Sequence, residues 1–244
     1  MKGSIKEKVI VLTGAGGGIG KVVATALAEQ GASLALCGGN NLERLAETER
    51  LVREKGAKVF TLAGNLTDQS FLDSCMDKIA EHFGKIDILI NNAGVAMNTP
   101  FDDVTYETFD RIMEINVRVP FFLCQKALPY LRKSDYAAIV NIASVVGHKG
   151  YVNQSVYAAS KHALLGFSKT LANEVYKENI RVHTVCPGGV FTDMVKLSRP
   201  DLTGEDMIMP EDIADIILFL LQNRTNAVID EICVHRSGKQ PFDV

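Results

Sequence analysis

The sequence predicts one doubly wound α/β domain, in which helices cover both faces of a seven-stranded parallel sheet. Short apolar runs alternate with helix-length amphipathic stretches, and a glycine-rich turn joins the first run to the first stretch. The chain has 244 residues, of which 47% are hydrophobic, which is enough for one large core. No linker rich in proline, glycine or serine divides it, so residues 1–244 are expected to form a single domain.

Seven short runs of β-branched and aliphatic residues are expected to form the strands. Each run is apolar almost throughout, which is typical of strands that are buried on both faces of a parallel sheet. In chain order the runs are residues 8–13, 33–37, 58–63, 86–90, 137–143, 180–186 and 231–235.

Amphipathic stretches between these runs are expected to form the helices. Pro210 suits the first position of a helix and is followed by two acidic residues. Pro120 predicts a kink in the fourth stretch, or a split after Asn116, because proline lacks an amide donor and clashes with the preceding turn. The stretches are residues 18–30, 41–55, 67–83, 105–133, 153–178 and 210–222.

Composition argues against several classes of partner. A formal net charge of −3 provides no basic field for nucleic acid, and no apolar run is long enough to cross a membrane. The cysteines are scattered singly, so we expect neither a disulfide framework nor a bound metal, and we predict a reducing, cytoplasmic setting. The cysteines are Cys37, Cys75, Cys124, Cys186 and Cys233.

The first predicted strand ends in "TGAGGGIG", residues 13–20, and a helical stretch follows at once. Glycines at this place let the turn bend tightly and let a pyrophosphate approach the backbone. The helix N-terminus then offers unpaired N–H groups and the positive end of its dipole. The order of strand, glycine turn and helix therefore indicates a Rossmann-type dinucleotide site.

Tyr157 and Lys161 lie four residues apart at the start of the fifth helical stretch, so their β-carbons are expected about 5–6 Å apart. An ammonium group at about 5 Å stabilises a phenolate by about 3 kcal/mol, or about two pKa units, which would bring a tyrosine closer to proton transfer at neutral pH. Such pairs also arise by chance. Alone, this pair does not distinguish a reactive site from a solvated helix face.

Further motifs decide between these alternatives. The sequence "NNAG" occupies residues 91–94, Ser144 precedes Tyr157 by thirteen residues, and "PGGVFTDM" occupies residues 187–194. With the spacing Thr-Gly-x-x-x-Gly-x-Gly in the first turn, the chain resembles the short-chain dehydrogenase/reductase family from about residue 6 to residue 236. The resemblance implies a nicotinamide-dependent oxidoreductase.

The resemblance implies a role for each of four catalytic residues. Tyr157 would exchange a proton with the substrate oxygen while a hydride passes between substrate and nicotinamide. Lys161 would lower the pKa of that tyrosine and bind the nicotinamide ribose. Ser144 would donate a hydrogen bond to the substrate oxygen, and Asn116 would hold a water molecule in a proton relay.

The cofactor contacts are implied in the same way. "GNLTD", residues 64–68, is similar to the adenine-contacting segment of the family, with Asn65 where an aspartate is usual. The expected cofactor-binding residues are Gly14, Gly18, Ile19, Gly20, Asn40, Asn65, Leu66, Asn91, Asn92, Ala93, Gly94, Tyr157, Lys161, Pro187, Gly188, Val190 and Thr192.

The choice between NAD and NADP is normally determined at the end of the second strand. Gly38 and Gly39 stand there in place of either an acid or a base, and Gly17 replaces the basic residue that many NADP-using relatives carry. Asn40 and Asn41 can hydrogen-bond ribose or phosphate. The expected cofactor is therefore NAD(P), and the absence of a repelling carboxylate favours NADP slightly.

The substrate is left open as a small-molecule alcohol or carbonyl compound. The segment expected to form a lid, about 194–210, is short, which suggests an exposed or narrow site. His148, Lys149 and Tyr151 follow Ser144 and are either pocket or surface residues. The tail from residue 228 departs from the ending that is common in fatty-acid-synthesis reductases of the family.

Assembly and alternative functions complete the predictions. Stretches 105–133 and 153–178 are more apolar than one buried face requires, and the resemblance implies that they pair in a homodimer or homotetramer; coverage by loops of the same chain is the alternative. The function that the sequence favours is that of a dehydrogenase or reductase. The alternatives are a catalytically idle NAD(P)-binding sensor or assembly subunit, and a nucleotide-sugar epimerase or dehydratase.

Overall fold

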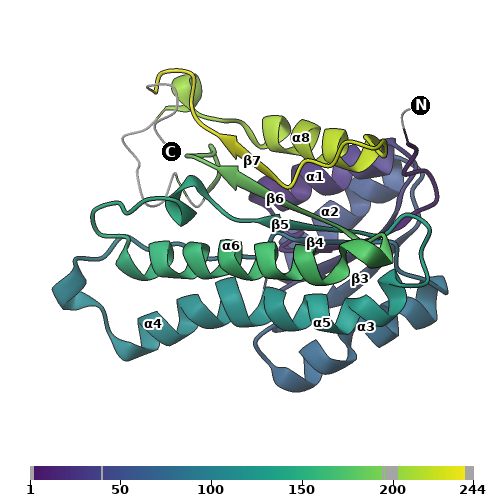
Figure 1. Ribbon diagram of the computed structural model, residues 1–244, viewed down its shortest axis with the longest axis horizontal. Helices are drawn as coiled ribbons and strands as arrows, with labels where there is room; N and C mark the ends of the chain where they lie inside the picture. Colours follow the sequence, from purple (N-terminus) through teal and green to yellow (C-terminus); the bar gives the residue numbers. More distant parts are fainter. Residues whose placement is uncertain (1–2, 40, 194, 196–202, 240–244) are drawn as a thin grey trace.

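The computed structural model describes residues 3–39, 41–193, 195 and 203–239. Its centre is a parallel sheet of seven strands in the order β3-β2-β1-β4-β5-β6-β7 (Figure 1). The strands are β1 Val9–Thr13, β2 Ser33–Gly38, β3 Val59–Ala63, β4 Ile88–Asn91, β5 Ala138–Ile142, β6 Arg181–Pro187 and β7 Glu231–Val234. Each lies within two residues of its predicted run, and the predicted fold class is confirmed.

Helices cover both faces of this sheet. The main helices are α1 Gly18–Glu29, α2 Leu42–Glu54, α3 Gln69–Phe83, α4 Tyr106–Met113, α5 Val119–Leu131, α6 Ser155–Val175 and α8 Pro210–Gln222. Shorter turns of helix are η1 Phe101–Asp103, η2 Glu114–Arg118, η3 Val145–Gly147, η4 Tyr176–Glu178 and η5 Gly204–Asp206.

Two hydrophobic cores result from this layering. One lies between the sheet and α1, α2 and α8, and the other lies between the sheet and α3, α5 and α6 (Figure 1). Strand β1 contributes to both, because successive side chains of a strand point to opposite faces: Ile10 and Leu12 join the first core, and Val9 and Val11 join the second. This explains why the strands read as continuous apolar runs rather than alternating ones.

The predicted disturbance at Pro120 is present in a different form. The helix does not stop after Asn116; α4 passes through a π-helical turn, η2, into α5, with Pro120 in the first turn of α5. A proline cannot donate to the carbonyl four residues earlier, here that of Asn116. The wider turn accommodates this missing bond and places Asn116 inside the molecule, 1% exposed.

The strand order places a switch point in the middle of the sheet. The chain runs outward from β1 through β2 to β3, then returns to β4 on the other side of β1 and continues outward to β7. The loops that follow β1 and β4 therefore diverge, and the crevice between them is where open α/β sheets bind ligands. Within the described residues, no helix has the length and hydrophobicity needed to cross a membrane.

Candidate active site

The glycine turn after β1 is shaped by close contacts that exclude side chains. Gly14 and Gly18 have φ values of 65° and 52°, which L residues rarely adopt. A β-carbon added to Gly20 would lie 2.1 Å from the Gly14 carbonyl oxygen and 2.7 Å from the Asn92 side-chain nitrogen. The turn therefore packs directly against the first residues of α1, and no side chain in the described part of the chain caps that helix.

Asn92 holds this turn from the neighbouring strand. Its Nδ2 group donates to the carbonyl oxygens of Thr13 and Gly14 at 3.0 and 3.1 Å. The backbone N–H groups of Asn92 and Ala93 both donate to Thr13 Oγ1 at 3.0 Å. The loops after β1 and β4 thus form one hydrogen-bonded unit.

Asn91 points away from this unit. It is the last residue of β4, and its side chain points to the face of the sheet that α5 covers. There its Nδ2 group contacts Asn141 Oδ1 at 2.9 Å and Cys124 Sγ at 3.3 Å. Asn141 in turn donates to Ser168 Oγ at 2.8 Å. The Asn91 side chain is thus part of a buried polar chain behind the site, and its predicted contact with a cofactor remains a prediction.

Ser144, Tyr157 and Lys161 come together at the carboxyl ends of β5 and β6. Ser144 caps η3, accepting from the Val146 N–H at 3.2 Å and donating to the Pro187 carbonyl oxygen at 3.2 Å. Lys161 Nζ lies 5.7 Å from the centroid of the Tyr157 ring. It also donates to the Ile142 carbonyl oxygen at 2.9 Å.

Burial controls the acidity of both titratable groups. It lowers the pKa of Lys161 to about 8, against an ordinary value of 10.5. It raises the pKa of Tyr157, and a hydrogen bond with the Ser144 side chain opposes that rise. The expected lowering of the Tyr157 pKa by the ammonium is therefore not what this geometry shows, because desolvation is the larger effect.

Asn116 connects the two halves of the site. Its Oδ1 accepts from the Val95 N–H and its Nδ2 donates to the Val95 carbonyl oxygen, both at 2.9 Å. The Nδ2 group also donates to Ser160 Oγ at 3.0 Å. A β-carbon on Gly94 would lie 3.3 Å from Asn116 Oδ1 and 3.6 Å from Lys161 Nζ, so loop, asparagine and lysine are in close contact.

Known proteins of one family are similar to this chain along most of its length. Residues 8–203 match the family model described as short chain dehydrogenase. The chain belongs to the short-chain dehydrogenase family. It is 32% identical to the 3-oxoacyl-(acyl-carrier-protein) reductase FabG of Thermotoga maritima over 93% of this chain and 96% of that protein.

Solved structures of the family have the same fold. A short chain dehydrogenase from Mycobacterium paratuberculosis bound to NAD superposes with a TM-score of 0.86 at 29% identity, over 95% of this chain and 97% of that one. An alcohol dehydrogenase from Thermococcus sibiricus complexed with 5-hydroxy-NADP has a TM-score of 0.87 at 26% identity, over 96% of this chain and 98% of that one. This short-chain dehydrogenase is an oxidoreductase, and its structural neighbours include one bound to NAD and one complexed with 5-hydroxy-NADP.

A cleft of about 400 Å³ adjoins the glycine turn of this short-chain dehydrogenase. Arg44, from the first turn of α2, lies beside it: a β-carbon on Gly17 would be 3.5 Å from Arg44 Nη1. The guanidinium also pairs with the Asp193 carboxylate at 3.1 Å. The cleft is lined by Gly16, Gly17, Gly18, Lys21, Glu43, Arg44, Glu47, Phe191, Thr192 and Asp193.

Sequence reasoning missed Arg44 and Ser160. Arg44 stands six residues after Gly38, beyond the positions where a cofactor-selecting base was sought, and the fold of α2 brings it back. Ser160, fully buried, donates to the Tyr157 carbonyl oxygen at 2.8 Å while it accepts from Asn116. Its place in the run "YAASK", between the two residues of the motif, was the available signal.

The segments expected to contact the adenosine are placed as follows. Asn40 lies outside the described residues. Asn41 Oδ1 caps α2 by accepting from the Arg44 N–H at 2.9 Å. Asn65, exposed two residues after β3, accepts from the Thr67 backbone N–H at 3.1 Å, and Leu66 is buried in the core. Ile19 lies in the first turn of α1 and packs against the other core.

The segment after β6 extends from β7 toward the glycine turn. Gly188 N–H donates to the Val234 carbonyl oxygen at 2.7 Å, and Val190 is buried and forms a bridge with Ile208. Thr192 lies close to the glycine turn, since a β-carbon on Gly18 would be 3.3 Å from its methyl group. Of the expected lid, Met194 and residues 196–202 lie outside the described residues.

The three residues singled out after Ser144 divide between two environments. Lys149 Nζ lies 5.4 Å from the ring centroid of Tyr151, which is 42% exposed. His148 instead turns toward β7, where its Nε2 atom is 2.5 Å from a Glu231 carboxylate oxygen. No pattern in the sequence associates His148 with Glu231.

Proposed function

We propose that this protein interconverts an alcohol and a carbonyl compound, with Tyr157 as the group that exchanges a proton with the substrate oxygen. The observation that carries the proposal is the meeting of Ser144, Tyr157 and Lys161 next to Gly94, in the loop that bonds to the glycine turn through Asn92. A dinucleotide suits this surface, because the glycines of the turn place no side chain between a pyrophosphate and the backbone, and α1 begins there. When bound, the nicotinamide donates or accepts the hydride.

In this proposal, the hydroxyl groups of Ser144 and Tyr157 both interact with the substrate oxygen. Ser144 is held at the end of β5 by its bonds to the Val146 N–H and the Pro187 carbonyl, so its position is fixed before substrate binds. The raised pKa of Tyr157 keeps its hydroxyl protonated at neutral pH, which supports proton donation to a carbonyl oxygen in the direction of reduction.

Lys161 is the next group after Tyr157 in the proposed proton relay. Its pKa of about 8 lies near neutral pH, so its ammonium can release and regain a proton at small cost. Asn116 and Ser160 fix the helix turn from which both Tyr157 and Lys161 project. The predicted water relay through Asn116 belongs to this proposal.

NADP is the proposed cofactor. Arg44 and Lys21 line the cleft at the glycine turn, and Gly38 and Gly39 place no carboxylate at the end of β2. A guanidinium suits a 2′-phosphate because it can form two parallel hydrogen bonds. Glu43, Glu47 and Asp193 line the same cleft, so a phosphate would compete with Asp193 for Arg44.

The test is a titration of the purified protein with NADPH and NADH, followed by measurement of nicotinamide oxidation with aldehydes, ketones and keto-esters. We expect tighter binding of NADPH and oxidation by at least one carbonyl class. Binding without turnover across the whole panel would contradict the enzymatic proposal and favour the NAD(P)-sensing alternative.

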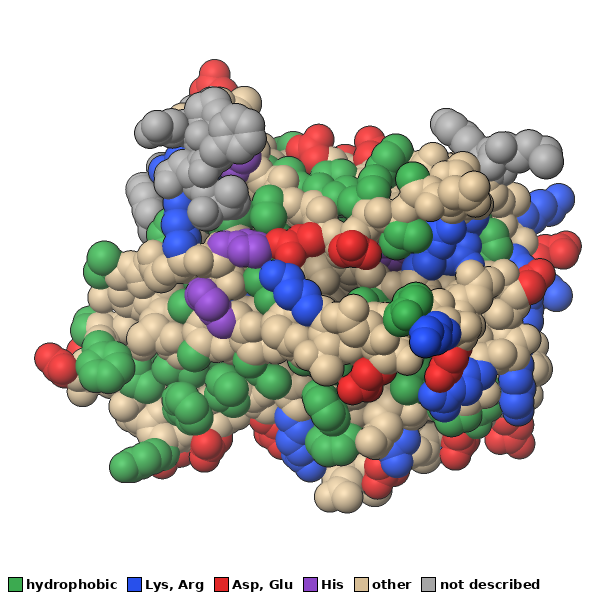
Figure 2. All heavy atoms as spheres, viewed as in Figure 1, with side chains coloured by type: hydrophobic (Ala, Val, Ile, Leu, Met, Phe, Trp, Pro, Cys, Tyr) green, Lys and Arg blue, Asp and Glu red, His purple; other side chains and the backbone are tan. Residues whose placement is uncertain are grey.

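A cytoplasmic homo-oligomer remains part of the proposal. Phe109 of α4 and Phe121 of α5 are 44% and 43% exposed, and the Phe121 ring lies 5.0 Å from that of Phe167 on α6. Figure 2 shows hydrophobic side chains gathered over these helices. Light scattering coupled to gel filtration should give a dimer or tetramer mass; a monomer would show that this apolar face stays exposed.

A further inference from the structure

Four side chains with metal-binding chemistry meet beside the site, on the side of β7. His148, Cys186, Glu231 and Cys233 each offer one ligand atom, and these atoms all lie within 4.8 Å of one another. We propose that they form a tetrahedral site for a thiophilic divalent ion, with Zn²⁺ as the expected occupant. This inference is independent of the proposed reaction, and it revises the expectation of no metal.

The fold builds the cluster from the pairing of its last two strands. Cys186 of β6 is in register with Cys233 of β7, so the two side chains stand next to each other on one face. Glu231 is two residues before Cys233 and therefore projects on that same face. His148, directly after η3, lies over them and contacts both β7 residues.

The spacing of the ligand atoms is close to that of a coordinated ion. Bonds of about 2.3 Å to sulfur and about 2.1 Å to nitrogen or oxygen, at tetrahedral angles, place ligand atoms about 3.4–3.8 Å apart. Cys233 Sγ is 3.6 Å from His148 Nε2 and 3.5 Å from Glu231 Oε1, and Cys186 Sγ is 3.8 Å from the same oxygen. The contact of 2.5 Å between His148 and Glu231 is shorter and has to open by about 1 Å when the ion enters.

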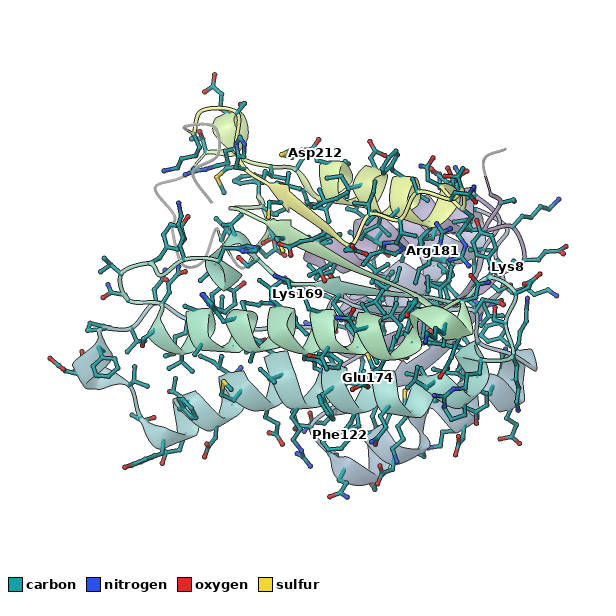
Figure 3. The ribbon with its side chains drawn as sticks, in the orientation of Figure 1. Lys8, Phe122, Lys169, Glu174, Arg181 and Asp212 are labelled. Atoms are coloured by element: carbon teal, nitrogen blue, oxygen red, sulfur yellow. The ribbon has the colours of Figure 1, made fainter. Side chains whose placement is uncertain are left out.

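Ligand type and charge favour zinc over a hard cation. Two sulfurs and one imidazole nitrogen suit Zn²⁺, whereas Mg²⁺ and Ca²⁺ prefer oxygen. Coordination removes the proton from each thiol. The charges of two thiolates, one carboxylate, the ion and the ammonium of Lys169, 3.4 Å from Glu231, then balance. Figure 3 labels Lys169 on α6, and Figure 2 shows a histidine beside acidic and basic side chains between α6 and β7.

Four protein ligands leave no open position, so the ion would be structural rather than catalytic. It would join η3, β6 and β7 at one point. Ser144 caps the N-terminus of η3, and the carbonyl of Pro187, next to Cys186, accepts the hydrogen bond from Ser144. Binding would therefore fix the loop that carries Ser144.

The experiment measures the metal content of the full chain purified under reducing conditions without chelator. We expect about one Zn²⁺ per chain, and, after removal and replacement by Co²⁺, the thiolate charge-transfer and visible bands of a tetrahedral cobalt site. The melting temperature should rise when Zn²⁺ is returned to the metal-free protein.

Matched variants locate the ion. Cys233→Ser and His148→Gln should weaken Co²⁺ binding by about 100-fold or more, since changes merely around metal ligands cost about 10–100-fold. Cys75→Ser and His235→Gln, which remove a thiol and an imidazole elsewhere, should retain one equivalent. Two results would overturn the proposal: no Co²⁺ spectrum in the reduced wild-type protein, or full metal content in both cluster variants, which would place the ion elsewhere.

Discussion

The two halves of the sheet build their parts of the site from different material. On the side of β1 to β3, the turn after β1 is shaped by glycines and by backbone groups that bond to Asn92. On the side of β5 to β7, the site consists of side chains, with Lys161 only 5% exposed and Ser144 7% exposed. The shape of the backbone-made part depends on close contacts that leave no room for added side chains. The chemistry of the other part depends on the burial and charge of its side chains.

This difference indicates which property of the protein a mutation in each half should change. A dinucleotide offers phosphates and riboses, which backbone N–H groups can bind without a titratable residue. Proton transfer needs titratable side chains whose pKa values are displaced from their ordinary range. A mutation of one half should therefore affect binding, and a mutation of the other should affect chemistry.

Removal of the Tyr157 hydroxyl should produce the largest effect. Tyr157→Phe should lower kcat/KM by about 1000-fold, because general acid–base catalysis contributes about 100- to 10,000-fold, while the dissociation constant for NADPH should change only a few-fold. Tyr176→Phe, at the exposed end of α6, is the control. A Tyr157→Phe enzyme with near wild-type turnover would remove the proposed mechanism.

Burial of Lys161 should appear in the pH dependence of stability. Between about pH 8 and 10.5 the unfolded chain holds a proton at this lysine that the folded chain has lost, so stability rises with pH in that window. Below about pH 8 the cost of burying the charge is fully present, up to about 3 kcal/mol. Urea unfolding of wild type and Lys161→Met from pH 7 to 11 should show this gain only in wild type; parallel profiles would contradict it.

Crowding of the glycine turn should affect the other half. The β-carbon of Gly20→Ala would meet the Gly14 carbonyl, so the free energy of unfolding should fall by about 2 kcal/mol, and NADPH binding should weaken by about 10-fold or more. Gly166→Ala, on an exposed helix surface where the added β-carbon would meet nothing in the described chain within 4 Å besides its own stretch of helix, should instead stabilise the fold by about 0.5–1 kcal/mol. Equal effects of the two substitutions would show that the turn is not sterically constrained.

Substitution of Arg44 should give the smallest effect. It tests the comparison between the two halves, because Arg44 is a charged side chain in the half that is otherwise formed by the backbone. Arg44→Ala should weaken NADPH binding by about 10-fold, because it removes a charge-assisted contact, and should leave NADH binding unchanged. Arg53→Ala, farther along α2 and paired with Glu49, is the control. Equal loss of both cofactors would assign Arg44 to the structure of the cleft rather than to phosphate recognition.

The pattern of apolar runs was sufficient to predict the strands, because strands buried on both faces have few other interpretations. The glycine spacing similarly predicted the turn. The turn requires glycine at position 20, because a β-carbon there would have no room. The pKa of Tyr157 could not be predicted from its distance to Lys161, because a pairwise Coulomb estimate omits desolvation. The orientation of Asn91 depends on which face of β4 it occupies.

The metal-type cluster escaped sequence reasoning for a different reason. Its residues come from a loop and two strands, and 38 positions separate His148 from Cys186. Only the lateral pairing of β6 with β7 brings the two cysteines together. Arg44 was missed in the same way, because its approach to the glycine turn depends on how α2 packs.

The central position of β1 has a consequence for synthesis of the chain. The ribosome releases β1 before β2 and β3, which can pair along one side of it, but the partner for its other side, β4, follows about 75 residues later. Until then Ile10, Val11 and Leu12 form an unpaired apolar edge on the nascent chain, the kind of edge that recruits other strands. The nascent protein should therefore depend most on chaperones, and aggregate most readily, during synthesis of the stretch between β1 and β4.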